Sequence, residues 1–189
     1  MTKPFDQCII LHGCPPTQEM VTPIEKRWMN WLAEELHKKG YNAIAPELST
    51  SWQPLYQTWK KEIEKFSVTN ESVLVGHSCG GAFLVRWLLE TKTVVKKLIL
   101  VAPAKVPETE NDTRKDLYDF ELPTKTPHLA DEIVLFISND FPHHLKSQEL
   151  YIKALHPRVI KLENKGHFLF FQMKTNAFPE LLDEVLATR

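Results

Sequence analysis

Three scarcities narrow the classes of protein to which this chain of 189 residues can belong. It has only three cysteines, Cys8, Cys14 and Cys79, and this odd, low count favours a reducing cytoplasm over a disulfide framework. No stretch reaches about 18 consecutive apolar residues, so we predict no membrane-spanning helix and no membrane partner. The formal net charge is only -1, which gives no electrostatic reason to expect nucleic acid as a partner.

The start of the chain also lacks the apolar run that a secretory signal peptide requires. Asp6 and Gln7 interrupt any such run directly after the first five residues. Together with the few cysteines, this predicts a cytoplasmic protein.

What the sequence does contain is an alternation of short apolar runs with amphipathic helical patterns. This alternation indicates β-α units around a mostly parallel sheet. We expect strands at residues 8–11, 41–46, 73–75, 98–101, 133–137 and 158–162. We expect helices at 23–39, 55–66, 82–89, 145–155 and 178–186, the first starting at Pro23 behind an N-cap at Thr22. About six strands with helices on both faces describe one doubly wound α/β domain over residues 1–189.

The alternation fails between residues 104 and 128. This segment is polar, contains Pro107, Pro123 and Pro127, and carries an acidic run around residues 108–112. Long loops in compact domains are usually functional or disordered. We expect a short flap beside the active site, and a solvated excursion of the surface is the alternative.

The strongest chemical motif is G-x-S-x-G at residues 76–80, with Ser78 at its centre. It follows an apolar strand directly and precedes an apolar helical pattern, which is the context of a nucleophile turn. Gly76 and Gly80 would remove the Cβ atoms that otherwise collide across such a sharp turn. We therefore predict that Ser78 is a nucleophile.

A serine hydroxyl needs a base and a carboxylate behind that base. His167 follows the last predicted strand in a loop with Gly166, at the strand end where ligands bind in open α/β sheets. Asp140 stands at the end of the preceding strand and follows the serine in the order expected of such enzymes. We predict His167 as the base and Asp140 as its carboxylate; a solvated turn aspartate is the alternative for Asp140.

Acyl transfer also requires hydrogen-bond donors for the developing oxyanion. We predict the backbone N–H of Cys79, the residue after the nucleophile, and the backbone N–H of Cys14 in the loop after the first strand. Pro15 and Pro16 in that loop have no N–H to donate. The two thiols would then lie close together, either as inert packed groups or with a redox role.

Several further residues lie on loops at the same predicted edge of the sheet. Candidates for lining a substrate pocket are His12, Trp52, Tyr56, Phe141 and Phe168, with ordinary packing as the alternative for each. The adjacent His143 and His144 lack a third metal ligand nearby, so we predict no metal site. No organic cofactor is expected.

These motifs together resemble those of the small α/β-hydrolases typified by retinoblastoma-binding protein nine and the bacterial YdeN-like proteins. The resemblance rests on His12-Gly13, the run from Gly76 to Gly81, Ser138-Asn139-Asp140 and Gly166-His167-Phe168, and it covers essentially the whole chain. It implies an α/β-hydrolase fold with a six-stranded parallel sheet, no large cap domain, and a triad of Ser78, Asp140 and His167. The loop after the first strand is poorer in glycine than in some relatives.

The leading functional hypothesis is a serine hydrolase that cleaves a small carboxylic ester or amide through an acyl-enzyme. One alternative is a protein-binding module that retains the fold. Another is an acyltransferase that uses the same triad. The sequence identifies neither the acyl substrate nor the oligomeric state, and a protein partner stays open.

Overall fold

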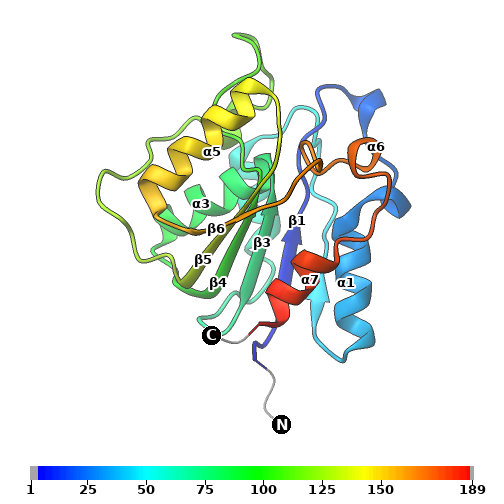
Figure 1. Cartoon of the computed structure of the whole chain (residues 1–189). Coiled ribbons are helices and arrows are strands. Elements are labelled where there is room, and N and C mark those ends of the chain that lie inside the picture. Colours follow the sequence, from blue (N-terminus) through cyan, green and yellow to red (C-terminus); the bar gives the residue numbers. More distant parts are fainter. Residues whose placement is uncertain (1–3, 188–189) are drawn as a thin grey trace.

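A six-stranded parallel sheet forms the centre of the computed structural model, which describes residues 4–187 (Figure 1). Residues 1–3 and 188–189, which belong to the predicted domain 1–189, lie outside the described residues. The strand order is β2-β1-β3-β4-β5-β6. The strands are β1 (Cys8–Leu11), β2 (Ala43–Ile44), β3 (Val73–His77), β4 (Val95–Val101), β5 (Ala130–Ile137) and β6 (Arg158–Lys161).

Helices cover both faces of this sheet, which confirms the predicted fold class. Figure 1 shows α1 and α7 on one side and α3 and α5 on the other. The helices are α1 (Trp28–Lys38), α2 (Tyr56–Ile63), α3 (Cys79–Thr91), α4 (Lys115–Tyr118), α5 (Pro142–Leu155), α6 (Phe170–Met173) and α7 (Pro179–Leu186). No helix in residues 4–187 is both long enough and apolar enough to cross a lipid bilayer.

The two faces of the sheet explain why its strands read as continuous apolar runs. Successive side chains of a strand point to opposite faces. In β1, Ile9 and Leu11 pack with α2, α3 and α5, whereas Cys8 and Ile10 pack with α1 and α7. Every residue of β1 and β3 is buried because both faces are covered.

The start of the first helix differs from the prediction. α1 begins at Trp28, and residues Ile24–Lys26 form a separate 3-10 turn. Arg27 is extended between the two, and its Nε donates a hydrogen bond to the carbonyl of Thr22 at 2.6 Å. The capping pattern at Thr22 and Pro23 was therefore misleading, because Arg27 holds the chain away from helical geometry at this point.

The segment 104–128 contains the short helix α4 and is attached to the rest of the chain by hydrogen bonds. Lys105 N–H donates to Ser147 Oγ at 3.0 Å, and Thr113 Oγ1 donates to the carbonyl of Trp52 at 2.9 Å. The side chain of Arg114 reaches the cavity described below. The segment therefore lies against the strand ends that carry the predicted catalytic residues.

Candidate active site

Ser78 occupies a strained turn between β3 and α3. Its backbone has φ 49° and ψ -117°, a left-handed φ that is uncommon for a residue with a side chain. The Ser78 N–H donates to the carbonyl of Val101 at 2.9 Å, and the Ser78 carbonyl accepts the N–H of Ala104 at 3.0 Å. The end of β4 therefore holds the turn in this conformation.

Glycines make this turn sterically possible. A Cβ at Gly76 would lie 2.6 Å from the Cα of Gly81, and a Cβ at Gly80 would lie 2.5 Å from the carbonyl oxygen of His12. Real Cβ atoms do not approach backbone so closely. The glycines of the motif thus allow α3 to start directly beside β3 and β1.

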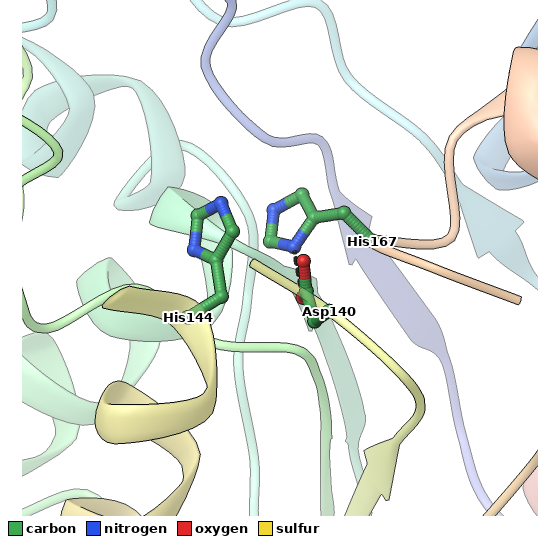
Figure 2. Close-up of side chains that lie close together, drawn as sticks. All are labelled: Asp140, His144 and His167. Atoms are coloured by element: carbon green, nitrogen blue, oxygen red, sulfur yellow. Dashed lines mark hydrogen bonds and ion pairs between the residues drawn. The ribbon is translucent and has the colours of Figure 1, made fainter. Parts of the chain in front are cut away.

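His167 and Asp140 form a direct pair at the ends of β6 and β5. His167 Nδ1 donates to Asp140 Oδ2 at 2.6 Å (Figure 2). The carboxylate also accepts the N–H of Phe141 at 2.7 Å and lies 3.5 Å from Gln148 Nε2. With Nδ1 committed to Asp140, the neutral imidazole leaves Nε2 as its acceptor, which is the arrangement that a general base requires.

Burial shapes the ionisation of this pair. Burial, aided by the positive charges of His143 and Arg114, lowers the pKa of His167 to about 3. Burial also raises the pKa of Asp140 above its ordinary value. A lowered histidine pKa keeps the imidazole neutral, and therefore able to accept a proton, at neutral pH.

Ser78 and His167 line the same cavity, which has a volume of about 460 Å³. Among the described residues, no hydrogen bond joins their two side chains. Catalytic hydrogen bonds are often long or poorly aligned when no substrate is bound. The structure thus brings Ser78, the predicted nucleophile, and the His167–Asp140 pair to one cavity.

The loop after β1 approaches Ser78 very closely. A Cβ at Gly13 would lie 3.0 Å from Ser78 Cβ and 2.9 Å from His77 Nδ1. Within residues 4–187, the backbone N–H groups of Cys14 and Cys79 donate to no other backbone group. These two residues flank the serine from the loop and from the start of α3, as an oxyanion site requires.

The side chains of the same two cysteines are in contact. Their buried thiols share a hydrogen bond. Burial raises the pKa of Cys14, whereas the hydrogen bond from Cys14 lowers the pKa of Cys79. The thiols therefore lie side by side, as the sequence predicted.

The predicted pocket residues divide into two groups. His12, Phe141 and Phe168 line the cavity, whereas Trp52 and Tyr56 are not among its described lining residues. The carbonyl of Trp52 instead accepts a hydrogen bond from Thr113 Oγ1 of the segment 104–128. Much of the remaining wall is apolar and comes from residues that the sequence did not single out: Pro15, Met20, Val21, Trp28, Met29, Phe170 and Phe171.

His12 has a bracing role as well as its place in the wall. Its Nδ1 lies 2.8 Å from the carbonyl oxygen of Gly13, and its Nε2 accepts the N–H of Leu48 at 2.9 Å. These contacts require the neutral tautomer with the proton on Nδ1. His12 thereby connects the loop after β1 to the segment after β2.

Asp140, His144 and His167 also bring potential metal-ligand atoms within 4.8 Å of one another (Figure 2). The two imidazole planes are inclined by only 15°, with ring centroids 3.7 Å apart. Ligand lone pairs lie in the ring planes, so two parallel stacked rings do not aim them at one point. The geometry suits a stacked pair of rings better than a metal centre.

Three side chains that the sequence analysis did not select support the site. His77 Nε2 donates to the carbonyl of His167 at 2.8 Å, and Gln172 Oε1 accepts the N–H of His167 at 2.7 Å. Arg114 Nη1 lies 3.4 Å from the carbonyl oxygen of Cys14. Only His77 had a local signal, since it stands inside the G-x-S-x-G motif; the other two depend on tertiary contacts.

A parallel sheet with a serine in a strained strand-to-helix turn, followed by a carboxylate and a histidine at later strand ends, defines an α/β-hydrolase fold. No large cap domain is present within residues 4–187. The model of the serine hydrolase family matches residues 20–182. The chain belongs to this family.

Solved structures agree on the fold. The ydeN gene product from Bacillus subtilis is 17% identical, with a TM-score of 0.80 and 97% of each chain covered. A YdeN-like hydrolase from Pectobacterium atrosepticum is 14% identical, with a TM-score of 0.70 and coverage of 96% of this chain and 89% of that one. A structure of the metagenome-derived lipolytic enzymes LipS and LipT is 15% identical, with a TM-score of 0.61 and coverage of 98% and 94%. No curated protein sequence matches the chain significantly.

Proposed function

We propose that this serine hydrolase cleaves a small carboxylic ester, with Ser78 as nucleophile, His167 as base and Asp140 as the carboxylate that orients the base. The observation that carries the proposal is the 2.6 Å hydrogen bond from His167 Nδ1 to Asp140, made beside a cavity that Ser78 also lines. A buried neutral imidazole oriented by a carboxylate is the group that a serine hydroxyl needs to become a nucleophile.

The proposed reaction has two halves. His167 Nε2 takes the proton of Ser78 as Oγ attacks the ester carbonyl, and the Cys14 and Cys79 N–H groups bind the oxyanion. The protonated His167 then gives its proton to the departing alcohol, which leaves an acyl group on Ser78. Water attacks this acyl-enzyme, again with His167 as base, and releases the carboxylic acid.

The cavity supports an ester with an apolar acyl part. Its wall is largely apolar, and Met20, Phe141 and Phe171, which are 60%, 52% and 60% exposed, extend that character to its rim. Burial of such a substrate contributes roughly 25 cal/mol per Å² of apolar surface. Lipolytic activity in LipS and LipT agrees with this preference and supports an ester over an amide.

Labelling with a fluorophosphonate probe tests the nucleophile, and p-nitrophenyl esters of increasing acyl length test the substrate class. Ser51 provides a matched control, because it is another buried serine in the same cavity wall. We expect Ser78→Ala to abolish labelling and hydrolysis, and Ser51→Ala to keep both.

A folded wild-type protein that neither labels nor hydrolyses any ester would contradict the proposal and favour a binding protein. Hydrolysis accompanied by acyl transfer to added alcohols would instead indicate an acyltransferase.

A further inference from the structure

The imidazole of His144 lies flat against the imidazole of His167. The ring centroids are 3.7 Å apart and the planes differ by 15° (Figure 2). His144 stands in the first turn of α5 and lines the same cavity. The base is therefore contacted at its edge by Asp140 and on one face by a second aromatic ring.

One rigid turn supplies both of these contacts. Asp140 Oδ1 accepts the N–H of Phe141 at 2.7 Å, Pro142 begins α5, and the His144 N–H donates to the carbonyl of Phe141 at 2.9 Å. Proline at the first helical position is pre-organised for the helix. The position of the carboxylate therefore fixes the position of the stacked ring.

The charges around His167 allow this ring to stay in place during a reaction. His167 faces Asp140, the ring of His77 at 5.0 Å and the ring of His144, and it feels the charges of His143 and Arg114. Burial, followed by the charge of His167, lowers the pKa of His144 to about 2. A neutral ring does not repel the imidazolium that forms when the base takes a proton.

The stacked ring also occupies the space from which water would reach that face of the base. Water beside the pair would compete for its hydrogen bond and loosen the orientation of the imidazole. Catalytic groups need to be held within about 0.5 Å and 10–20° of their productive geometry. A flat ring restricts rotation of His167 out of the plane that contains Asp140.

We propose that His144 is a positioning residue, which holds the His167 imidazole in line with Asp140 and keeps water from its face. This role rests on the proposed function of His167 as the base. It needs the flat ring of His144 and not its nitrogen atoms, since Nδ1 of His144 is buried without a hydrogen-bond partner among the described residues.

Two substitutions separate the ring from its nitrogens. His144→Phe keeps a flat aromatic ring, whereas His144→Ala removes it and admits water. Leu145→Ala is the matched control, because it truncates the next residue of the same turn, is 40% exposed and lies outside the cavity wall. The assay is hydrolysis of p-nitrophenyl butyrate across pH, with kcat and KM measured separately.

We expect His144→Ala to lower kcat about 10-fold with little change in KM, which is a modest loss for a misplaced catalytic group. The acidic limb of its pH–rate profile should move to higher pH. Water beside His167 would relieve the burial that lowers the pKa of its imidazole. His144→Phe and Leu145→Ala should stay within about 2-fold of the wild type, with unchanged profiles. A residue with a merely structural role would not move the pH profile.

Proton NMR provides a readout that does not depend on activity. The proton between His167 Nδ1 and Asp140 should give a low-field signal in the wild type and in His144→Phe, and should exchange away in His144→Ala. A wild type that shows this signal without hydrolysing esters would refute the proposed esterase function. The NMR comparison of His144→Phe with His144→Ala would then still decide whether the ring holds His167 in place. Wild-type signal and kcat in His144→Ala, or equal losses in both variants, would overturn the role of the ring.

Discussion

The close approach of Gly13 to Ser78 predicts that a larger residue at position 13 will lower activity. In Gly13→Ala, the new Cβ would lie 2.9 Å from His77 Nδ1 and 3.0 Å from Ser78 Cβ, whereas ordinary contacts begin at 3.4 Å. The loop that carries Cys14 must therefore move away from Ser78 by roughly 0.5 Å, the limit within which catalytic groups need to be held.

The magnitude of the effect follows from this displacement. Overpacking of this kind costs about 1–3 kcal/mol of stability, which a domain with about 5–15 kcal/mol can lose and stay folded. A shift of about 1 Å in a catalytic group can lower the rate about 100-fold. We expect kcat/KM for p-nitrophenyl butyrate to fall between about 10- and 100-fold.

Gly40→Ala is the matched control for this variant. Gly40 has φ +81° and nothing within 4 Å of its would-be Cβ. Alanine there costs about 1–2 kcal/mol through its left-handed backbone alone. Urea unfolding should show comparable losses of stability in the two variants, and only Gly13→Ala should lose activity. Full activity in a folded Gly13→Ala protein would refute the placement of this loop against the nucleophile.

Four other predictions follow from the same structure. Asp140→Asn should lower kcat by about 10³–10⁴ because the amide favours the wrong tautomer of the base; a loss below 10-fold in the p-nitrophenyl ester assay would argue against the pair. Lys97→Ala should cost about 3–5 kcal/mol in urea unfolding, because Lys97 is 5% exposed and forms ion pairs with Glu132 and Glu184. Lys96→Ala, at a half-buried neighbour whose ion pair with Glu71 lies at the surface, should cost under about 1 kcal/mol; equal effects would contradict this. His77, His144 and His167 have pKa values lowered to about 2–3, so the unfolded chain binds protons first as the pH falls below about 6.5. Each should therefore remove up to about 2 kcal/mol of stability between pH 7 and pH 5; an unchanged urea midpoint would show that they are not held neutral. Because the thiols beside the nucleophile are buried, mild oxidant should leave activity unchanged, and a loss reversed by reductant would reveal a redox role.

The parallel sheet and the grouping of the candidate site residues at one edge of it were predictable from the sequence because both depend on local patterns. Apolar runs marked the strands, and residues at the ends of parallel strands meet at one edge. Ser78, Asp140 and His167 each follow such a run. Their positions in the fold therefore followed from their places in the chain.

Features that depend on packing between distant segments were not predictable in the same way. α1 starts five residues later than expected at Trp28, because the extended Arg27 bonds to Thr22. Trp52, a candidate pocket residue, is not among the described residues that line the cavity. The stacking of His144 on the base depends on the turn geometry after β5, which spacing in the sequence does not reveal.

The central claim is that Ser78 carries an acyl group during turnover. Rapid mixing with a p-nitrophenyl ester, followed by acid quench and intact-protein mass spectrometry, measures this group directly. We predict a transient mass increase equal to one acyl group, located on the peptide that contains Ser78 and absent in Ser78→Ala. An active wild type that forms no adduct while p-nitrophenol is released in a burst, or an adduct that persists in Ser78→Ala, would contradict the account.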